Sequence, residues 1–272
     1  MIKVEADAYT HRGLIRDKNE DNFFLDGIFI DENQSNNCAK FSISKSSEEY
    51  IFAVCDGMGG QKYGEKASFA AVKILKKLHE KITESPGKKD IETIIRCLKS
   101  YVSKANEYIY DMSVKKGSPI GTTFACLTIS GNKAVALNLG DSRVYLIRKG
   151  EIKRLTTDHT EAERLIRLGA LTRESALTHN SRHRLYRYFG ISPSEGILEA
   201  DFSDIIEIEK DDKFLICSDG LTDTIEEQAL LQIARGKMKN SEICASFVKE
   251  ALNRGGDDNI TSILINIKDI EG

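Results

Sequence analysis

Four aspartates stand where an apolar run of the chain meets a tight turn. Asp56 follows Phe-Ala-Val-Cys, Asp141 follows Leu-Asn-Leu-Gly, and Asp219 follows Phe-Leu-Ile-Cys-Ser. Asp258 comes just before the last apolar run, 260–267. A carboxylate at the edge of a core is costly unless it is paired or bound to a metal ion. These four side chains could converge at one rim of a sheet, or they could lie in four separate β-turns as solvated aspartates.

A convergent set of carboxylates requires divalent cations, because like charges repel one another unless cations hold them together. Oxygen ligands alone favour Mg²⁺ or Mn²⁺ over Zn²⁺. Two such cations about 3.5–4 Å apart lower the pKa of a water that they share, and so supply hydroxide as a nucleophile at neutral pH. The residues alone leave the cation site and the solvated turns open as alternatives.

The elements that must position these aspartates are mostly strands. Runs of β-branched and aromatic residues predict strands, the first of them an edge strand, at 3–10, 23–25, 41–44, 51–55, 121–130, 134–139, 144–147, 152–155, around 199–208, within 213–220 and at 260–267. We expect the consecutive strands of 121–155 to form a β-meander. In this arrangement Asp141 would lie in a turn between two neighbours of one sheet.

Helices are predicted by apolar residues at helical spacing. Two amphipathic helices start near 65 and 91, and Pro86-Gly87 ends the first of them. Later helices are expected from the capping-box spacing of Thr160 to Glu163 and at about 226–234 and 241–253. The first two helices need an apolar partner surface, which the strands on either side can supply.

Composition indicates one globular domain. The 272 residues are 40% hydrophobic and 30% charged, which is ordinary for a folded protein. Only three prolines occur and no Gly/Ser-rich linker divides the chain, so we expect a single domain over 1–272. Residues 169–198 lack a clear period and belong to a long irregular insert at about 160–198, which is typical of a functional or mobile segment.

Charge and cysteine content restrict the compartment and the partners. The net charge of −3 gives no general reason to expect nucleic acid or an anionic membrane as partner. No apolar run approaches the roughly 18 residues that span a bilayer, and the charged start of the chain is unlike a signal peptide. Four of the six cysteines lie in apolar segments as small core residues, namely Cys55, Cys126, Cys217 and Cys244. We therefore expect a cytoplasmic protein.

Seven short motifs occur along the chain in a particular order. They are Arg16–Asp21, Val54–Gly60 with Gly64, Glu65, Ala67 and Ser68, Gly121–Thr123, Gly140–Arg143, Thr157–Thr160, Cys217–Asp223 and Asp257–Thr261. Together they resemble the bacterial members of the PP2C (PPM) family of metal-dependent protein serine/threonine phosphatases, over roughly residues 8–267. The resemblance implies an α+β fold: a four-layer α-β-β-α sandwich of two antiparallel sheets flanked by antiparallel helix pairs. It also implies a metal cleft at one end, with the insert at about 160–198 as the flap.

The resemblance assigns the core metal ligands. Asp56 would bridge two ions, Mg²⁺ or Mn²⁺, and the carbonyl of Gly57 would bind one of them. Asp219 and Asp258 would complete the other.

The outer ligands and the phosphate contact follow from the same resemblance. Glu20 and Asp21 would act mainly through metal-bound waters, and Asp141 would help Asp219 to bind a third, weaker ion. Arg16 lies five residues before Asp21, which is the family's spacing for the arginine that binds phosphate.

The function implied is hydrolysis of phosphoserine and phosphothreonine on proteins by a metal-activated water, reversing a bacterial Ser/Thr kinase. The partners would be phosphorylated proteins and a cognate kinase, with no nucleic acid or membrane, and the enzyme would be a monomer. A phosphatase of an anti-sigma-factor antagonist would differ only in substrate. The alternative from another class is a catalytically inactive pseudophosphatase that binds phosphoproteins. A complete set of core ligands favours the enzyme.

The chain departs from the family pattern at several positions. Met58 stands where many eukaryotic members carry a histidine proposed as general acid, and Gln61 replaces a histidine common in bacterial relatives. The segment 180–190 matches the flap only loosely, which leaves substrate preference open. For His159 we expect a structural role. The flap histidines, His179 and His183, could contact a phosphopeptide or lie on a solvated flap, and Asp223 is expected in a turn or at a helix start.

Overall fold

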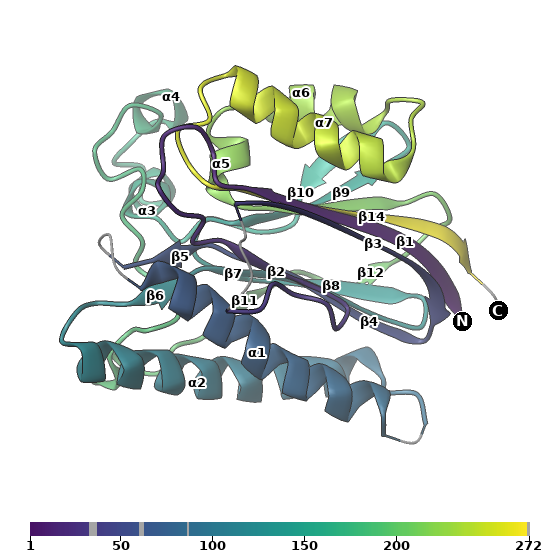
Figure 1. The fold of residues 1–272 in the computed structure, drawn as a ribbon, viewed down its shortest axis with the longest axis horizontal. Coiled ribbons are helices and arrows are strands. Elements are labelled where there is room, and N and C mark those ends of the chain that lie inside the picture. The colour runs from purple at the N-terminus through teal and green to yellow at the C-terminus, as the bar shows by residue number, and fades with distance from the viewer. Residues whose placement is uncertain (33–36, 60–62, 86, 271–272) are drawn as a thin grey trace.

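Two antiparallel sheets stack face to face in the centre of the computed structural model, which describes residues 1–32, 37–59, 63–85 and 87–270 (Figure 1). Sheet A has the strand order β10 (Glu151–Arg154), β9 (Arg143–Arg148), β13 (Lys213–Cys217), β14 (Ile260–Ile270), β1 (Ile2–His11) and β3 (Cys38–Ser47). Sheet B has the order β11 (Asp201–Phe202), β8 (Lys133–Leu139), β7 (Phe124–Ser130), β4 (Glu49–Cys55) and β2 (Asn22–Leu25), and β12 (Ile206–Glu207) also pairs with β8. A short ribbon of β5 (Gly57–Met58) and β6 (Gly121–Thr122) extends one end of the sandwich.

Helices cover both outer faces, which confirms the four-layer sandwich. The helices α1 (Gly64–Thr83) and α2 (Ile91–Lys116) pack on sheet B, and α5 (Asp219–Thr222), α6 (Glu227–Ala234) and α7 (Asn240–Asn253) pack on sheet A (Figure 1). The segment 160–198, which we call the flap, carries α3 (Glu161–Arg167), α4 (Arg173–Ala176) and a 3₁₀ turn, Pro193–Glu195. None of the helices in the described part of the chain combines the length and the apolar character that crossing a membrane requires.

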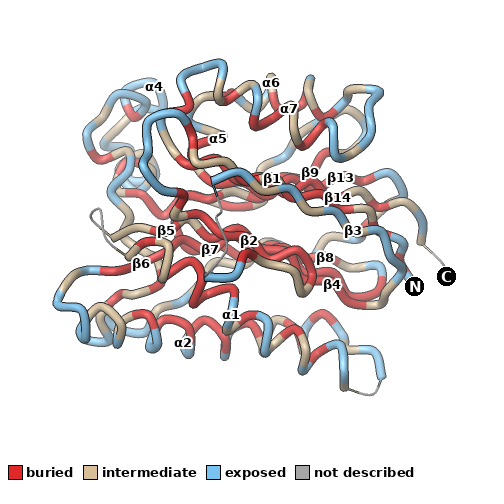
Figure 2. The backbone as a smooth tube through the Cα atoms, in the orientation of Figure 1, coloured by how far each residue is buried: buried red, intermediate tan, exposed pale blue. Residues whose placement is uncertain are grey.

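Buried apolar residues form one layer between the sheets and one under each helical cover. Figure 2 shows the buried positions along the central strands and on the helices that cover them. Strand β4 shows why a central strand of this fold is apolar at every position. Tyr50 and Phe52 face the layer between the sheets, whereas Ile51, Ala53 and Cys55 face the layer under α1 and α2. Successive side chains of a strand point to opposite faces, so a strand covered on both sides is apolar at every position.

Two sequence predictions about the sheets are wrong. Strand β1 is not at an edge, because it lies between β14 and β3, and the largely exposed β3 takes the edge. The run 121–155 is not a meander of one sheet: β7 and β8 pair in sheet B, but β9 and β10 belong to sheet A. The chain crosses between the sheets at 140–142, where Gly140 has a φ of 97° that favours glycine.

Other boundaries differ by a few residues or by a break. The predicted strand 121–130 is divided at Thr123 into β6 and β7, and α2 continues to Lys116, where Gly117 ends it in the left-handed conformation. The short helix α5 was not expected from the sequence. Thr160 caps α3 as predicted, since its hydroxyl accepts a hydrogen bond from the Glu163 N–H. Pro86 lies outside the described residues.

Candidate functional site

A cleft of about 500 Å³ is lined by residues that include Gly57 and Met58 of β5 and Asp219 of α5. These two elements lie at the same end of the sandwich (Figure 1). Seven of the eight residues predicted for the site line this cleft: Arg16, Glu20, Asp56, Gly57, Asp141, Asp219 and Asp258. The eighth, Asp21, is fully buried just before β2. Residues from five separate parts of the chain therefore meet in one place, so the aspartates at strand ends converge rather than lie in four separate turns.

Asp56 is positioned by the backbone and hydroxyls of the 121–123 motif. The N–H of Asp56 donates to the Thr123 hydroxyl at 2.9 Å, and the Asp56 carbonyl accepts from the Thr122 hydroxyl and the Thr123 N–H, each at 2.9 Å. The Thr123 hydroxyl in turn pairs with the Ser142 hydroxyl at 2.7 Å. The two threonines thus hold the main chain at the end of β4 and leave the Asp56 carboxylate to face the cleft.

The glycines beside Asp56 are required by close packing against Glu20. A Cβ on Gly57 would lie 2.5 Å from the Glu20 carbonyl oxygen and 2.2 Å from the carbonyl oxygen of Gly64. A Cβ on Gly64 would lie 2.6 Å from the Glu20 carboxyl carbon. The Glu20 carbonyl also accepts a hydrogen bond from the Ser68 hydroxyl at 2.6 Å. Side chains at these glycines would push Glu20 away from the cleft.

Asn259 joins the first loop of the chain to the start of the last strand. Its side-chain amide donates to the carbonyls of Arg12 and Lys18 at 2.7 and 2.8 Å, and its side-chain oxygen accepts from the Glu20 N–H at 2.7 Å. Its own N–H donates to the Asp258 carboxylate at 2.8 Å. One asparagine therefore places the loop that carries Arg16 beside Asp258.

Asp21 lies beneath the cleft and accepts hydrogen bonds from two hydroxyl groups on sheet A. The Ser218 and Thr261 hydroxyls donate to the same carboxylate oxygen at 2.8 and 2.6 Å. Ser218 begins the segment that presents Asp219, and a Cβ on the following Gly220 would lie 2.1 Å from the Asn259 carbonyl oxygen. This close approach brings Asp219 and Asp258 to the same wall of the cleft.

Asp141 lies where the chain crosses from sheet B to sheet A. Its residue surface is only 8% exposed, and among the described residues no hydrogen bond or ion pair reaches its carboxylate. The guanidinium of the neighbouring Arg143 is hydrogen-bonded to Asp158 at 2.6–3.2 Å, and its charge only partly opposes the effect of burial on the pKa of Asp141. Asp141 is thus a nearly buried carboxylate that faces the cleft without a hydrogen-bonded or ion-paired partner among the described residues.

Burial and mutual repulsion raise the pKa values of the clustered aspartates. Burial is the largest cause in each case, and it raises the pKa of Asp21 to about 7 and that of Asp219 to about 6. The pKa values of Asp56 and Asp141 are well above their usual range for the same reason, with repulsion from the other aspartates added. Such a set of oxygen donors fits divalent cations, whose charge would offset this repulsion.

Arg16 is the only arginine or lysine among the described residues that line the cleft. Its guanidinium donates to the Asp258 carboxylate at 2.7 Å, and its side chain is 54% exposed. The arginine therefore stands at the rim, where the solvent and a ligand in the cleft can both reach it.

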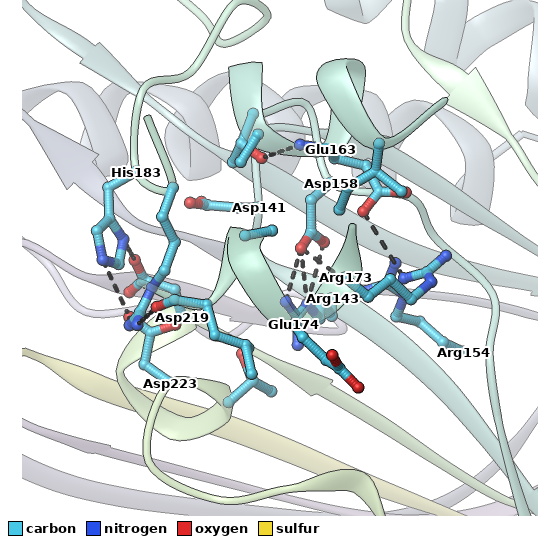
Figure 3. Close-up of a pocket in the computed structure, with 17 residues that line it drawn as sticks. Asp141, Arg143, Arg154, Asp158, Glu163, Arg173, Glu174, His183, Asp219 and Asp223 are labelled. Atoms are coloured by element: carbon cyan, nitrogen blue, oxygen red, sulfur yellow. Dashed lines mark hydrogen bonds and ion pairs between the residues drawn. The ribbon is translucent and has the colours of Figure 1, made fainter. Parts of the chain in front are cut away.

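The flap contributes His183 to the cleft. Its Nδ1 lies 3.8 Å from the Asp219 carboxylate and its Nε2 lies 3.6 Å from the Asp223 carboxylate (Figure 3). Arg182 pairs with Asp223 at 2.8 Å. Asp223 lies in the turn that follows α5, which is the first of the two positions expected for it. The other flap histidine, His179, instead pairs with the Ser181 hydroxyl at 2.7 Å.

His159 is buried within the protein, in agreement with the structural role expected for it. Its Nδ1 accepts from the Gly140 N–H at 3.2 Å, and its Nε2 pairs with the Asp201 carboxylate at 3.0 Å. Burial lowers the pKa of His159 below its usual value, although Asp201 opposes this effect. The histidine therefore supports the crossing segment next to Asp141.

Some residues that build the site were not predicted individually. Thr123, Ser218 and Asn259 fall within the motifs, but their type and position alone do not show that they bind across the sheets. His183 falls in the segment that matches the family least, and only its place beside Asp219 shows that it belongs to the cleft. Met58 lines the cleft where a histidine was considered, and Gln61 lies outside the described residues.

Comparisons with known proteins agree with this geometry. The family model "Protein phosphatase 2C" matches residues 10–260. The serine/threonine phosphatase stp of Listeria welshimeri is 33% identical over 264 residues, which cover 96% of this chain and 95% of that protein. Among solved structures, serine/threonine phosphatase Stp1 from Staphylococcus aureus is 27% identical with a TM-score of 0.81, over 99% of this chain and 96% of that one.

A further solved structure is similar over almost the whole chain. It is the catalytic domain of the serine threonine protein phosphatase PstP in complex with two manganese ions. The two chains are 25% identical with a TM-score of 0.77, and the match covers 99% of this chain and 100% of that one. The family match extends over most of the sequence, and the structural matches agree with the sandwich and its cleft. This chain belongs to the protein phosphatase 2C family.

Proposed function

We propose that this chain is a metal-dependent phosphatase that hydrolyses phosphoserine and phosphothreonine on proteins. The observation that carries the proposal is the cleft itself, in which the carboxylates of four aspartates converge beside an arginine at the rim, and one of them, Asp141, is buried. The relatives with the same fold are named serine/threonine phosphatases, which supports the same reaction for this chain.

The residues present fit a set of divalent cations, Mg²⁺ or Mn²⁺, because they offer carboxylate oxygens. Burial and repulsion from other aspartates raise the pKa values of Asp56 and Asp141, and a bound cation would offset both effects. Asp56 would be shared by two ions, with the Gly57 carbonyl, Asp219 and Asp258 as further ligands. When bound, the cations would lower the pKa of a water that attacks phosphorus and would neutralise the charge on its equatorial oxygens.

The outer ligands fit the same assignment. Glu20 and Asp21 would act through waters, and Asp141 would serve a third ion with Asp219. Asp21 is the deepest of these side chains, and the hydroxyls of Ser218 and Thr261 orient its carboxylate.

Arg16 would bind the phosphate of the substrate. A guanidinium presents two N–H groups in one plane and can bind two phosphate oxygens at once. The ion pair with Asp258 holds Arg16 at the rim, and its exposed position allows it to turn toward a phosphate in the cleft. The arginine would therefore orient the substrate, and its charge would stabilise the transition state.

A covalent route through cysteine is disfavoured by the thiols nearest to the site. Cys55 precedes Asp56 and Cys217 lies two residues before Asp219, but both side chains are fully buried. Burial raises the pKa of Cys217 to about 12 and that of Cys55 well above its usual value, so neither is a thiolate at neutral pH. Direct attack by water on phosphorus remains the route that these residues support.

The finer parts of the proposal concern the cell. We propose a cytoplasmic monomer with a single phosphatase domain over 1–272, whose flap covers about 160–198. Its substrates would be proteins phosphorylated by a cognate bacterial Ser/Thr kinase, without nucleic acid or membrane as partner. The pseudophosphatase alternative gains no support, since the relatives are named as phosphatases and the full set of core ligands is present.

The proposal is tested with the purified protein, p-nitrophenyl phosphate and a phosphothreonine peptide. Both should be hydrolysed in the presence of Mn²⁺, and EDTA should abolish the activity. Absence of turnover with Mg²⁺, Mn²⁺ and several other divalent ions would favour the pseudophosphatase.

A further inference from the structure

Three side chains from separate parts of the chain converge beside the core of the cleft. Asp141 comes from the crossing between the sheets, Asp219 from the start of α5, and His183 from the flap (Figure 3). One ligand atom from each lies within 4.8 Å of the others. Two carboxylates and one imidazole at this spacing could share a single cation.

Asp141 supplies an independent reason to expect a ligand. More than nine-tenths of its surface is buried, it faces the cleft, and no described residue donates a hydrogen bond to its carboxylate or forms an ion pair with it. A buried carboxylate without a partner is costly, because it has lost its water and gained nothing in exchange. A cation beside Asp141 would remove that cost.

His183 is close to the carboxylates without being hydrogen-bonded to them. Its distances of 3.8 Å to Asp219 and 3.6 Å to Asp223 exceed those of a hydrogen bond. The imidazole is 56% exposed, so burial does not force it into this position. The ring is thus free to turn a nitrogen toward a cation that Asp141 and Asp219 hold.

We propose that Asp141, Asp219 and His183 form a cation site in which the flap histidine is a ligand, so that the site prefers Mn²⁺ or another transition-metal ion over Mg²⁺. The inference rests on the proposed function, which places a third, weaker ion between the two aspartates. Its new element is the imidazole. Nitrogen ligands suit transition metals, whereas Mg²⁺ takes oxygen ligands almost exclusively.

A cation at this site would also fasten the flap to the floor of the cleft. Arg182 and His183 are neighbours, and Arg182 already pairs with Asp223 on the floor. His183 is shared between the cleft and a second cavity of about 380 Å³, whose apolar lining includes Ala162, Ile166 and Leu177. An ion bound by His183 would therefore hold in place the part of the flap that separates the cleft from this second cavity.

The test measures ion binding directly by isothermal titration calorimetry of the metal-free protein with Mn²⁺ and, separately, with Mg²⁺. The wild type should bind one Mn²⁺ that His183→Ala loses or binds at least about tenfold more weakly, since even outer partners of metal ligands contribute that much. The affinity for Mg²⁺ should change by less than about threefold, because an imidazole contributes little to Mg²⁺ binding. His179→Ala is the matched control and should behave as the wild type.

Two further variants separate coordination from simple ion pairing. His183→Asp should keep the extra ion but lose the preference for Mn²⁺ over Mg²⁺, because a carboxylate replaces the nitrogen. Asp223→Asn should leave Mn²⁺ binding unchanged, since this side chain is outside the proposed ligand set. Circular dichroism of each variant confirms that it is folded.

Limited digestion with trypsin reports on the flap. Mn²⁺ should slow cleavage after the flap arginines of the wild type and of His179→Ala, but not of His183→Ala. The inference is overturned if His183→Ala binds Mn²⁺ with the stoichiometry and affinity of the wild type, or if the wild type binds no ion beyond the two of the core. A protein that binds all its ions but does not hydrolyse a phosphopeptide would instead contradict the proposed function.

Discussion

The short strand β2 has a buried aspartate at each end, and the two differ in their partners and in the direction of their pKa shifts. Asp26, just after the strand, accepts hydrogen bonds from the His79 ring at 3.0 Å and the Ile51 N–H at 3.2 Å, and pairs with the Lys45 ammonium at 2.5 Å. Burial alone would raise the pKa of Asp26, but these partners lower it below its usual value. Asp26 is a structural carboxylate with counter-ions supplied by the protein.

Asp21, just before the same strand, belongs to the acidic cluster. Neutral hydroxyls of Ser218 and Thr261 donate to it, and burial raises its pKa to about 7. The groups that surround a buried carboxylate therefore indicate its role. Where lysine and histidine side chains bind the carboxylate, it serves stability, and where the carboxylate lies among other aspartates, it suits a cation from outside.

The largest expected effect is the loss of activity in Asp56→Asn. A neutral amide in place of the shared ligand weakens two ions at once, so kcat with p-nitrophenyl phosphate should fall by more than about 1,000-fold. Arg16→Ala is the control, because it removes a phosphate contact and leaves the proposed ligands intact, and its loss should be at least about tenfold smaller. Equal losses in steady-state assays with saturating Mn²⁺ would argue against a shared ligand.

Asp26→Asn should have the opposite signature. Removing the charge leaves Lys45 and His79 without their partner and should cost roughly 3 kcal/mol of unfolding free energy, measured in urea. The activity per folded molecule should be unchanged, because Asp26 is outside the cleft. If Asp26→Asn kept the stability of the wild type, or lost activity while folded, Asp26 would not be a purely structural carboxylate.

Saturating Mn²⁺ should stabilise the protein through the acidic cluster. A ligand at about 100 times its Kd adds about 2.7 kcal/mol, which for a chain of this size raises the Tm by roughly 5–10 °C. Asp26→Asn should gain as much as the wild type, whereas Asp56→Asn should gain clearly less. Differential scanning calorimetry with and without EDTA measures all three, and an equal gain in Asp56→Asn would place the ions elsewhere.

The smallest effect expected is the pH dependence of the Asp26 contribution. Because the pKa of Asp26 is lower in the folded protein than in the unfolded chain, its ionised form stabilises the fold above the ordinary aspartate pKa of about 4. This contribution is lost as the pH falls through the folded pKa. The difference in unfolding free energy between the wild type and Asp26→Asn should therefore be constant near neutrality and shrink below pH about 4. If this difference in unfolding free energy instead grew as the pH falls, the pKa of Asp26 would be higher in the folded protein than in the unfolded chain, which would contradict the prediction.

Much of the fold and of the cleft could be predicted from the sequence. Apolar runs and helical periods indicate the layers, because the pattern of side chains reports which faces are buried. Aspartates at the ends of such runs make a convergence of Asp56, Asp219 and Asp258 one of two alternatives, and the family resemblance favours it. The motif order adds Arg16 and Glu20, which no local pattern would have selected.

The pairing of strands could not be predicted in the same way. A period of two shows that a strand has one buried face, but it does not name the neighbours, so β1 was expected at an edge and β9 in the sheet of β8. For His183 the sequence leaves a phosphopeptide contact and a solvated position open, because the segment around it has no apolar period and its contacts are polar and distant in sequence. Asn259 acts through backbone groups some 240 positions away, which its residue type does not announce.

The place of β14 in sheet A has a consequence for synthesis on the ribosome. Although Ile260–Ile270 is made after every other strand of the described fold, it lies between β13 and β1, and Asn259 at its start joins the loop of Arg16 to the cleft. Chains are made from the N-terminus onward at about 5–20 residues per second. Strand β1 therefore cannot pair with β14 until nearly the whole chain has been synthesised. A nascent chain can therefore carry all seven motifs up to residue 261 and still have no assembled cleft, which delays phosphatase activity until the last strand has docked.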